Sequence, residues 1–163
     1  MKKMTGVIAL AIAAAFLASG LMVSTPDVSA AKLKSQVKIP AKYKGKHMPE
    51  GGWTNEKMIA RGKLVYTGKV NKKVKCSKCH GTKGKPKAKG ARDFRKASNV
   101  EKFSDTYWFF RIADGVPKTL MKGWLGKITE DDIWAVMAYE NMFSHGGKPA
   151  VPDKSKWEAP QFK

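Results

Sequence analysis

The sequence predicts an all-α fold, and three observations support this prediction. Two segments, one starting near Asn55 and one after Thr129, carry apolar residues at the i, i+3 and i+4 spacing of an amphipathic helix. A third, from Phe103 to Ala113, is rich in aromatic and aliphatic residues and is followed by glycine and proline. No segment shows the apolar–polar alternation of a β-strand, and no internal repeat is present.

The first helix is expected from Asn55 to about Thr67, with Thr54 as its N-cap. A glycine inside a helix costs about 1 kcal/mol relative to alanine. Gly62 therefore indicates a place where another helix comes too close for a side chain. The expected apolar face of this helix comprises Met58, Ile59, Gly62, Val65 and Tyr66.

The remaining helices have clear boundaries in the sequence. The aromatic segment is expected to become helical near Ser104 or Asp105 and to end at Gly115 and Pro117. The last helix is expected to start at Thr129, because Thr129-Glu130-Asp131-Asp132 is close to a capping box, and to reach about Phe143. One stripe of this helix contains Ile133, Val136, Met137 and Glu140.

Residues 1–30 have the pattern of a secretory signal peptide. Two lysines precede an apolar stretch from Val7 to Leu17, and Val28-Ser29-Ala30 supplies the small residues before a cleavage site. The alternative is an uncleaved membrane anchor, because Met4 to Val23 is about the length of a membrane span. In both cases we expect the folded part to lie outside the cytoplasm, in the periplasm.

After the signal, the chain has room for one domain of ordinary size. Residues 31–53 have no clear period and are expected to form an extended N-terminal arm. Residues 54–143 contain the three helical patterns and are expected to form the domain. Residues 144–163 contain proline and are expected to form a C-terminal tail.

The chain is strongly basic, with 32 Lys and Arg against 13 Asp and Glu and a formal net charge of +19. The segment from Lys57 to Arg92 contains 13 basic residues and no acidic one. Such a surface attracts acidic proteins in a salt-dependent manner, and it would also attract anionic lipid. Nucleic acid binding is disfavoured, because the segment is poor in aromatic residues for base stacking and export is expected.

Cys76-Ser77-Lys78-Cys79-His80 lies inside this basic segment and reads C-x-x-C-H, the attachment pattern of a c-type haem. Two thiols at this spacing reach the two vinyl groups of one porphyrin, and the next residue offers an imidazole to the iron. Cys76 and Cys79 are the only cysteines in the chain. We therefore expect one covalently bound haem c, with these two residues as thioethers and His80 as an axial ligand.

Two other kinds of site would use the same residues. A redox-active dithiol normally starts a helix within a thioredoxin-like βαβ pattern, and no strand–helix alternation is visible. A zinc site needs four protein ligands, or three and a water molecule. Cys76, Cys79 and His80 are too close together to serve easily, and only the distant His47 and His145 remain.

The iron of an electron carrier is expected to have a second protein ligand, and a thioether opposite histidine raises the reduction potential. Met121 is the preferred candidate because it lies in a loop just before the last helix. The alternatives are His47 or His145, or an open iron position for ligand binding or catalysis. The remaining methionines are weaker ligand candidates: Met58, Met137 and Met142 lie in expected helices, where they fit a packing role, and Met48 precedes the haem motif.

Residues from about Thr54 to Phe143 together resemble a class I, monohaem cytochrome c. The resemblance implies a cytochrome c fold of about three to four helices around one covalent haem, with the first and last helices crossing at Gly62 and Tyr139. Two features depart from it: Lys122 stands where a proline usually follows the methionine, and the segment between Tyr66 and Cys76 is longer and basic. The similar segments are Gly62–Tyr66, Cys76–Gly81, Gly84–Arg95, Arg111–Trp124 and Asp132–Tyr139.

The resemblance also implies roles for residues around the haem. The carbonyl of Pro86 would accept a hydrogen bond from the second nitrogen of His80, which would fix the orientation of the imidazole. Arg111 or Trp124 would reach a haem propionate, although Arg111 fits an exposed helix position equally well.

The expected function is electron transfer between Fe(III) and Fe(II) haem, without catalysis of bond chemistry by the chain itself. Acidic redox proteins are the expected partners on the basic surface. The alternative is a haem subunit held permanently in a larger periplasmic oxidoreductase through Ala31 to Gly52 and Ser144 to Lys163.

Overall fold

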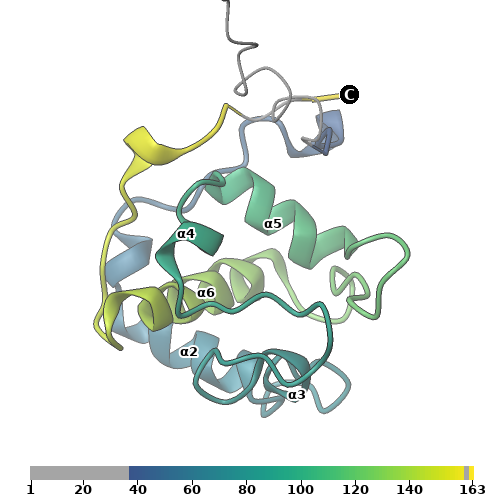
Figure 1. Cartoon of the computed structure of the whole chain (residues 1–163), viewed down its shortest axis with the longest axis vertical. Coiled ribbons are helices and arrows are strands. Elements are labelled where there is room, and N and C mark those ends of the chain that lie inside the picture. Colours follow the sequence, from purple (N-terminus) through teal and green to yellow (C-terminus); the bar gives the residue numbers. More distant parts are fainter. Residues whose placement is uncertain (1–36, 160–161) are drawn as a thin grey trace, which may run out of the picture. The chain divides into compact units, whose positions relative to one another are not determined.

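The computed structural model describes residues 37–159 and 162–163, and Figure 1 shows their arrangement. These residues form helices and isolated β-bridges, and none of them belongs to a β-strand, so the all-α prediction is confirmed. The expected signal peptide and the first residues of the expected arm lie outside this range. Within it, no helix is both long and apolar enough to cross a membrane.

Helices α2 (Glu56–Tyr66) and α6 (Glu130–Asn141) form the most extensive contact between elements (Figure 1). They meet at Gly62, where an added Cβ would lie 2.6 Å from the carbonyl carbon of Ala135 and 2.9 Å from Cβ of Tyr139. No side chain fits at this point, so the two helices cross at Gly62 and Tyr139, as the sequence predicted.

The helix starts follow the sequence closely, with one correction. The Thr129 side chain accepts a hydrogen bond from the Asp132 amide and the Asp132 side chain accepts one from the Thr129 amide, which completes the predicted capping box of α6. The N-cap of α2 is Asn55, whose side chain accepts from the Met58 amide. The prediction of Thr54 was wrong because Thr54 belongs to the preceding 3-10 turn, η2 (Gly52–Thr54).

Helix α5 (Asp105–Asp114) packs against α6 and contributes the centre of the core. Ser104 caps its start by accepting a hydrogen bond from the Tyr107 amide, as predicted. Phe109 of α5 is fully buried and lies against Trp134 of α6, with 4.3 Å between the ring centroids. Cys76 of the haem motif packs against the same core cluster.

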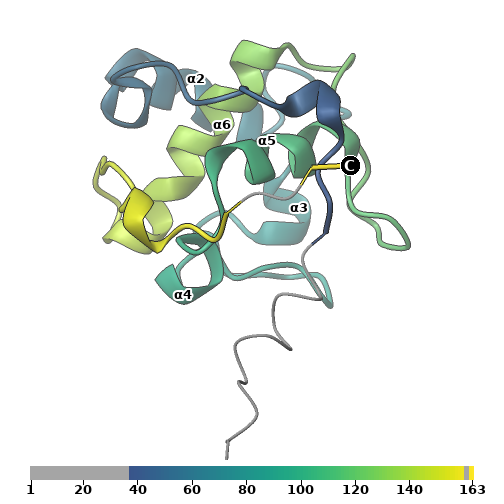
Figure 2. The ribbon, with the colours of Figure 1, turned by 90° about the horizontal axis from the view of Figure 1, so that it is seen from above.

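Short elements connect these helices (Figure 2). The haem motif forms α3 (Ser77–His80), and the sequence did not predict α4 (Ala97–Val100), a single turn without a side-chain cap. The remaining short elements are the 3-10 turns η1 (Ala41–Tyr43), η3 (Met142–His145) and η4 (Lys154–Lys156).

Both described ends of the chain pack onto the domain. In the segment expected to be an extended arm, the side chains of Ile39, Tyr43 and Trp53 are buried in the core, so this part of the segment belongs to the folded domain. In the tail, the Glu158 amide donates to the Lys102 carbonyl at 2.8 Å, and the Lys163 amide donates to the Ile39 carbonyl at 2.9 Å.

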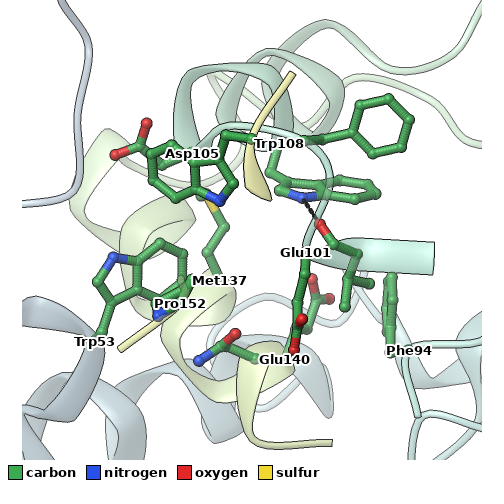
Figure 3. A pocket seen from close by; sticks show the side chains of 12 residues that line it. Trp53, Phe94, Glu101, Asp105, Trp108, Met137, Glu140 and Pro152 are labelled. Atoms are coloured by element: carbon green, nitrogen blue, oxygen red, sulfur yellow. Dashed lines mark hydrogen bonds between the residues drawn. The ribbon is translucent and has the colours of Figure 1, made fainter. Parts of the chain in front are cut away.

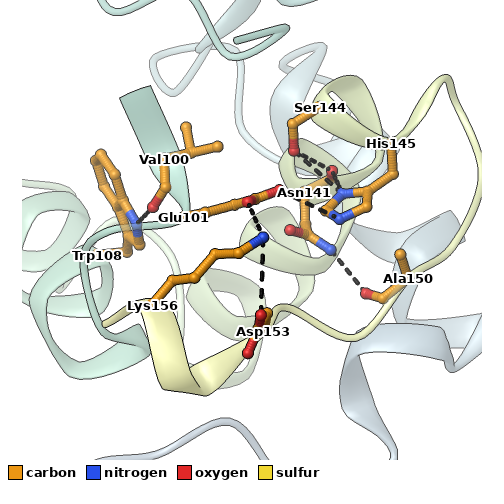
Figure 4. A network of polar contacts seen from close by, with 9 residues as sticks. All are labelled: Val100, Glu101, Trp108, Asn141, Ser144, His145, Ala150, Asp153 and Lys156. Atoms are coloured by element: carbon orange, nitrogen blue, oxygen red, sulfur yellow. Dashed lines mark hydrogen bonds and ion pairs between the residues drawn. The ribbon is translucent and has the colours of Figure 1, made fainter. Parts of the chain in front are cut away.

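Charged side chains also hold the C-terminal tail against the domain (Figure 4). Lys156 Nζ lies 3.3 Å from Glu101 Oε2 and 3.7 Å from Asp153 Oδ2. His145 Nε2 lies 3.6 Å from the other carboxylate oxygen of Glu101. Glu101, at the end of α4, is therefore the acid on which two basic side chains of the tail region converge.

Candidate functional site

The two cysteines lie on a single helical turn. Cys76 adopts helical angles immediately before α3, and its carbonyl accepts hydrogen bonds from the amides of Cys79 (3.1 Å) and His80 (2.9 Å). Both thiols are free and half-buried. Residues three apart in a helix share a face, so both sulfurs are available to one ligand with two attachment points.

The thiol chemistry does not favour the two alternative sites. Burial raises the pKa of the Cys76 thiol, and the negative charge of Glu140 raises it further. A redox-active dithiol requires the opposite shift. Among the described residues, no group of three or more His, Cys, Asp and Glu side chains is arranged to hold a metal ion by itself.

His80 is held in one orientation. Its side chain is buried, with Nδ1 3.2 Å from the Arg92 carbonyl and the ring stacked on Phe94 at a centroid distance of 4.4 Å. Burial lowers its pKa, which favours the neutral imidazole that binds metals. With the proton assigned to Nδ1, the other nitrogen, Nε2, has no hydrogen-bond partner among the described residues.

The carbonyl beside His80 corrects one expectation. It belongs to Arg92 and not to Pro86, which the resemblance implied. The amides of Lys87 and Ala88 both donate to the Cys79 carbonyl, at 2.8 and 3.1 Å. These bonds hold the chain around Pro86 at the end of α3, so a residue farther along the loop reaches the imidazole.

Helix α2 positions the haem motif through Tyr66. The Tyr66 hydroxyl, fully buried at the end of α2, donates to the Gly81 carbonyl at 2.6 Å. Gly81 has a φ of 76°, and an added Cβ would lie 3.1 Å from the carbonyl carbon of Lys85. The residue after His80 must therefore be glycine for the chain to turn away beneath the imidazole.

Two buried guanidinium groups lack acidic partners among the described residues. Arg111 is 6% exposed, and its Nη1 is buried without any hydrogen bond. Arg92 is half-buried, its Nη1 donates to the Asn99 carbonyl at 2.7 Å, and burial together with the charge of Arg111 lowers its pKa. The exposed alternative for Arg111 is therefore wrong.

Aromatic rings surround both cations but do not neutralise them. The Arg111 guanidinium lies 5.1 Å from the Tyr107 ring centroid, and that of Arg92 lies 5.1 Å from the Trp108 ring centroid. A buried donor without a partner costs about 1–3 kcal/mol, and more when it is charged. The pair is complementary to carboxylate groups, so the donor set fits a haem with two propionates.

The loop after α5 holds Met121 against the core. The Val116 amide donates to the Met121 carbonyl at 2.8 Å, and the Trp124 amide donates to the Ile112 carbonyl at 3.0 Å. The Met121 side chain is half-buried and packs on the core cluster, whereas its neighbour Leu120 is 82% exposed. The Trp124 ring is half-buried beneath Lys127, with Nζ 5.1 Å from its centroid.

The two other histidines are engaged elsewhere. His47 Nδ1 lies 3.1 Å from Asp105 Oδ1, and its side chain is largely exposed. His145 Nδ1 lies 2.9 Å from the Asn141 carbonyl, and its Nε2 lies near Glu101 (Figure 4). Neither contact supports a second histidine ligand.

Sequence reasoning missed three residues around the motif: Arg92, Phe94 and Glu140. Nothing in a run of basic residues distinguishes a buried arginine such as Arg92 from its exposed neighbours. Phe94 stacks on His80 and also lines a cavity with about 490 Å³ of empty space, partly open to solvent (Figure 3). Glu140 lines the same cavity, and its position on an apolar helix stripe was the available signal.

The chain was compared with protein-family models and with curated proteins. A family model described as cytochrome c oxidase, cbb3-type, subunit III matches residues 57–139. No curated protein matches the chain in sequence.

Two solved structures resemble this chain over part of its length. A chain of the reducing HAO-like protein complex of Kuenenia stuttgartiensis is 24% identical, with 53% of this chain and 44% of that chain covered and a TM-score of 0.44. Cytochrome CL from the marine methylotroph Methylophaga aminisulfidivorans is 17% identical, with 76% and 69% covered and a TM-score of 0.44. The chain thus spans less than half of the first of these two.

Proposed function

Because the chain belongs to the c-type cytochrome family described as subunit III of cbb3-type cytochrome c oxidase, we propose that it is an exported electron carrier with one haem c. Covalently bound haem c is the cofactor of this family, in agreement with the sequence prediction. When bound, the haem supplies a one-electron couple between Fe(III) and Fe(II). The chain's own residues attach it, orient it and screen it from water.

One observation carries the proposal: the C-x-x-C-H turn presents a buried, neutral imidazole that is tied at Nδ1 and free at Nε2. In our assignment, Cys76 and Cys79 form the thioether bonds and His80 is one axial ligand. The hydrogen bond to the Arg92 carbonyl orients the imidazole and increases the basicity of Nε2. Met121 is the second axial ligand, which its half-buried position on the core supports.

The propionates are assigned to Arg111 and Arg92. The unpaired Nη1 of Arg111 supports this assignment, because a carboxylate would supply the missing acceptor. In this arrangement two buried cations balance two carboxylates, and neither charge is left alone in the protein interior.

The basic surface is assigned to docking of acidic redox proteins. Asn71, in the basic loop before the motif, donates from Nδ2 to the Lys127 carbonyl at 2.9 Å. This bond holds the exposed Lys72 and Lys73 beside the loop that follows Met121. Positive charge next to the proposed haem edge would steer an acidic partner toward a short electron-transfer distance.

Intact mass and absorption spectra of protein exported by a host that attaches c-type haem test the assignment. We expect cleavage after Ala30 and the added mass of one haem, which is lost when Cys76 and Cys79 are both replaced by serine. The oxidised protein should show the weak far-red band of methionine ligation. Met121→Ala should abolish the band and admit carbon monoxide after reduction, whereas Met58→Leu should leave both unchanged.

Two results would contradict the proposal. A secreted polypeptide without added tetrapyrrole would refute haem attachment, and prompt carbon monoxide binding by the unmodified protein would refute the second ligand. Size-exclusion chromatography of the native protein distinguishes a free carrier from a permanently bound subunit of a larger complex.

A further inference from the structure

Glu140 is an acid without a partner. It is half-buried in the last turn of α6, and no hydrogen bond or ion pair joins its side chain to another described residue. Every other buried or half-buried acid in the described part of the chain has at least one partner; these are Asp93, Glu101, Asp105, Glu130 and Asp132. Glu140 is therefore not explained as a structural charge.

The cavity beside Glu140 is mostly apolar, and no cationic side chain lines it. Together with Met137, it lines the cavity from α6, opposite Trp53 and Trp108 (Figure 3). No lysine, arginine or histidine lines this cavity, although the chain has a formal net charge of +19. Burial in this setting raises the pKa of Glu140 to about 8.

The titratable groups that face Glu140 come from four places. Glu101, after α4, forms an ion pair with Lys156 and lies 3.6 Å from His145 Nε2, and Asp105, at the start of α5, accepts hydrogen bonds from backbone amides. From the other side, Tyr66 of α2 and Cys76 of the motif each have a pKa raised first by burial and then by the charge of Glu140. Glu140 thus lies within electrostatic range of a haem-attachment residue.

We propose that Glu140 binds a proton when the haem accepts an electron, which makes the chain a proton-coupled electron carrier. This inference rests on the proposed function, because it requires a haem at Cys76. On reduction, the iron goes from Fe(III) to Fe(II) and the proton affinity of the Glu140 carboxylate rises, so within its titration range a larger fraction of it takes a proton from solvent and becomes the neutral acid. Oxidation releases the electron and that fraction of a proton, and only the carboxyl O–H bond forms or breaks.

The sign and size of the coupling follow from electrostatics. Oxidised haem carries one more positive charge, which stabilises the Glu140 carboxylate and weakens its hold on the proton. If the iron lies on the order of 10 Å from the Glu140 carboxylate, an effective dielectric constant of about 20 gives a roughly tenfold change in proton affinity. A tenfold change corresponds to about 59 mV for a one-electron couple. The midpoint potential should therefore fall by that amount as the pH rises through the Glu140 titration.

The proposal is tested by measuring the midpoint potential of the haem-loaded protein by spectroelectrochemical titration at pH values around the pKa of Glu140. Glu140→Gln should remove the part of the fall that comes from Glu140, because glutamine mimics the neutral acid. Asp131→Asn removes an exposed acid from the same helix and should keep the unmodified pH profile. Propionate titration would affect all three proteins equally, so the difference between them isolates Glu140.

Infrared difference spectra between reduced and oxidised protein supply a second readout. We expect a protonated carboxyl band to appear on reduction and to be absent from Glu140→Gln. The proposal is overturned if Glu140→Gln keeps the pH dependence of the unmodified protein, or if the unmodified protein has a flat profile. A flat profile with a normal haem spectrum defeats only this inference, whereas a missing haem spectrum defeats the proposed function.

Discussion

Replacing Gly62 by alanine tests the helix crossing on which the site is built. Helix α2 ends at Tyr66, which holds the Gly81 carbonyl beside His80, so a shift of α2 against α6 would move the haem motif. The Cβ of alanine would lie 2.6 Å from the carbonyl carbon of Ala135 and 2.9 Å from Cβ of Tyr139. The first of these atoms belongs to backbone within a helix and cannot rotate away.

Two opposing effects set the magnitude. Alanine in place of glycine favours an isolated helix by about 1 kcal/mol. Forcing extra volume into a packed contact costs about 1–3 kcal/mol, and the rigid backbone places this position at the upper end. We therefore expect Gly62→Ala to lower the free energy of unfolding by about 2 kcal/mol net.

Urea unfolding of the haem-loaded protein measures the change in the free energy of unfolding. Equal m-values for the variant and the unmodified protein check that both unfold in two states. Ala60→Gly is the matched control, because residue 60 is an exposed position of the same helix, and it should cost about 1 kcal/mol from propensity alone. If Gly62→Ala is as stable as the unmodified protein, or more stable, the close crossing of α2 and α6 is refuted.

Three further outcomes are expected. Arg111→Gln should lower the unfolding free energy of the haem-loaded protein by about 1.5–3 kcal/mol in urea, because a charged hydrogen bond is lost, whereas the exposed control Arg95→Gln should have a clearly smaller effect, because water screens its ion pair. The double change Lys72→Glu and Lys73→Glu should slow stopped-flow reduction by an acidic cupredoxin at low salt, and the difference should shrink as ionic strength rises; equal rates at low salt would exclude this docking face. The raised pKa of Glu140 stabilises the fold fully below its ordinary value of 4.5, and this stabilisation is lost as the pH rises to about 8. The loss should be on the order of a few kcal/mol and absent in Glu140→Gln, and an unfolding free energy that rises across this window would contradict the reasoning.

Several features of the chain could be predicted from short stretches of sequence. The capping box of α6 depends on Thr129 and Asp132, which are three residues apart, and the same is true of the two cysteines on one helical turn. Gly62 was informative because an unexplained glycine in a helix indicates close packing whatever the partner is. These inferences succeeded because the interacting groups are near neighbours in the chain or because one residue type has a single strong physical reason.

Other features depend on contacts between distant segments. The carbonyl that orients His80 belongs to Arg92 because the loop between them is held at the end of α3, and no local pattern specifies where such a loop crosses the imidazole. Similarly, Ile39 and Tyr43 are core residues although the segment around them has no period.

The sequence by itself determined the fold class, the starts of the three longest helices to within a residue and the haem-attachment motif. Only the tertiary structure decided which charges are buried. In the sequence, Arg111 fits an exposed helix position and Glu140 is only an acid on an apolar stripe, yet the first has a buried donor without an acceptor and the second lines a mostly apolar cavity. Desolvation depends on everything packed around a group, and for these two residues that environment comes from helices far apart in the chain.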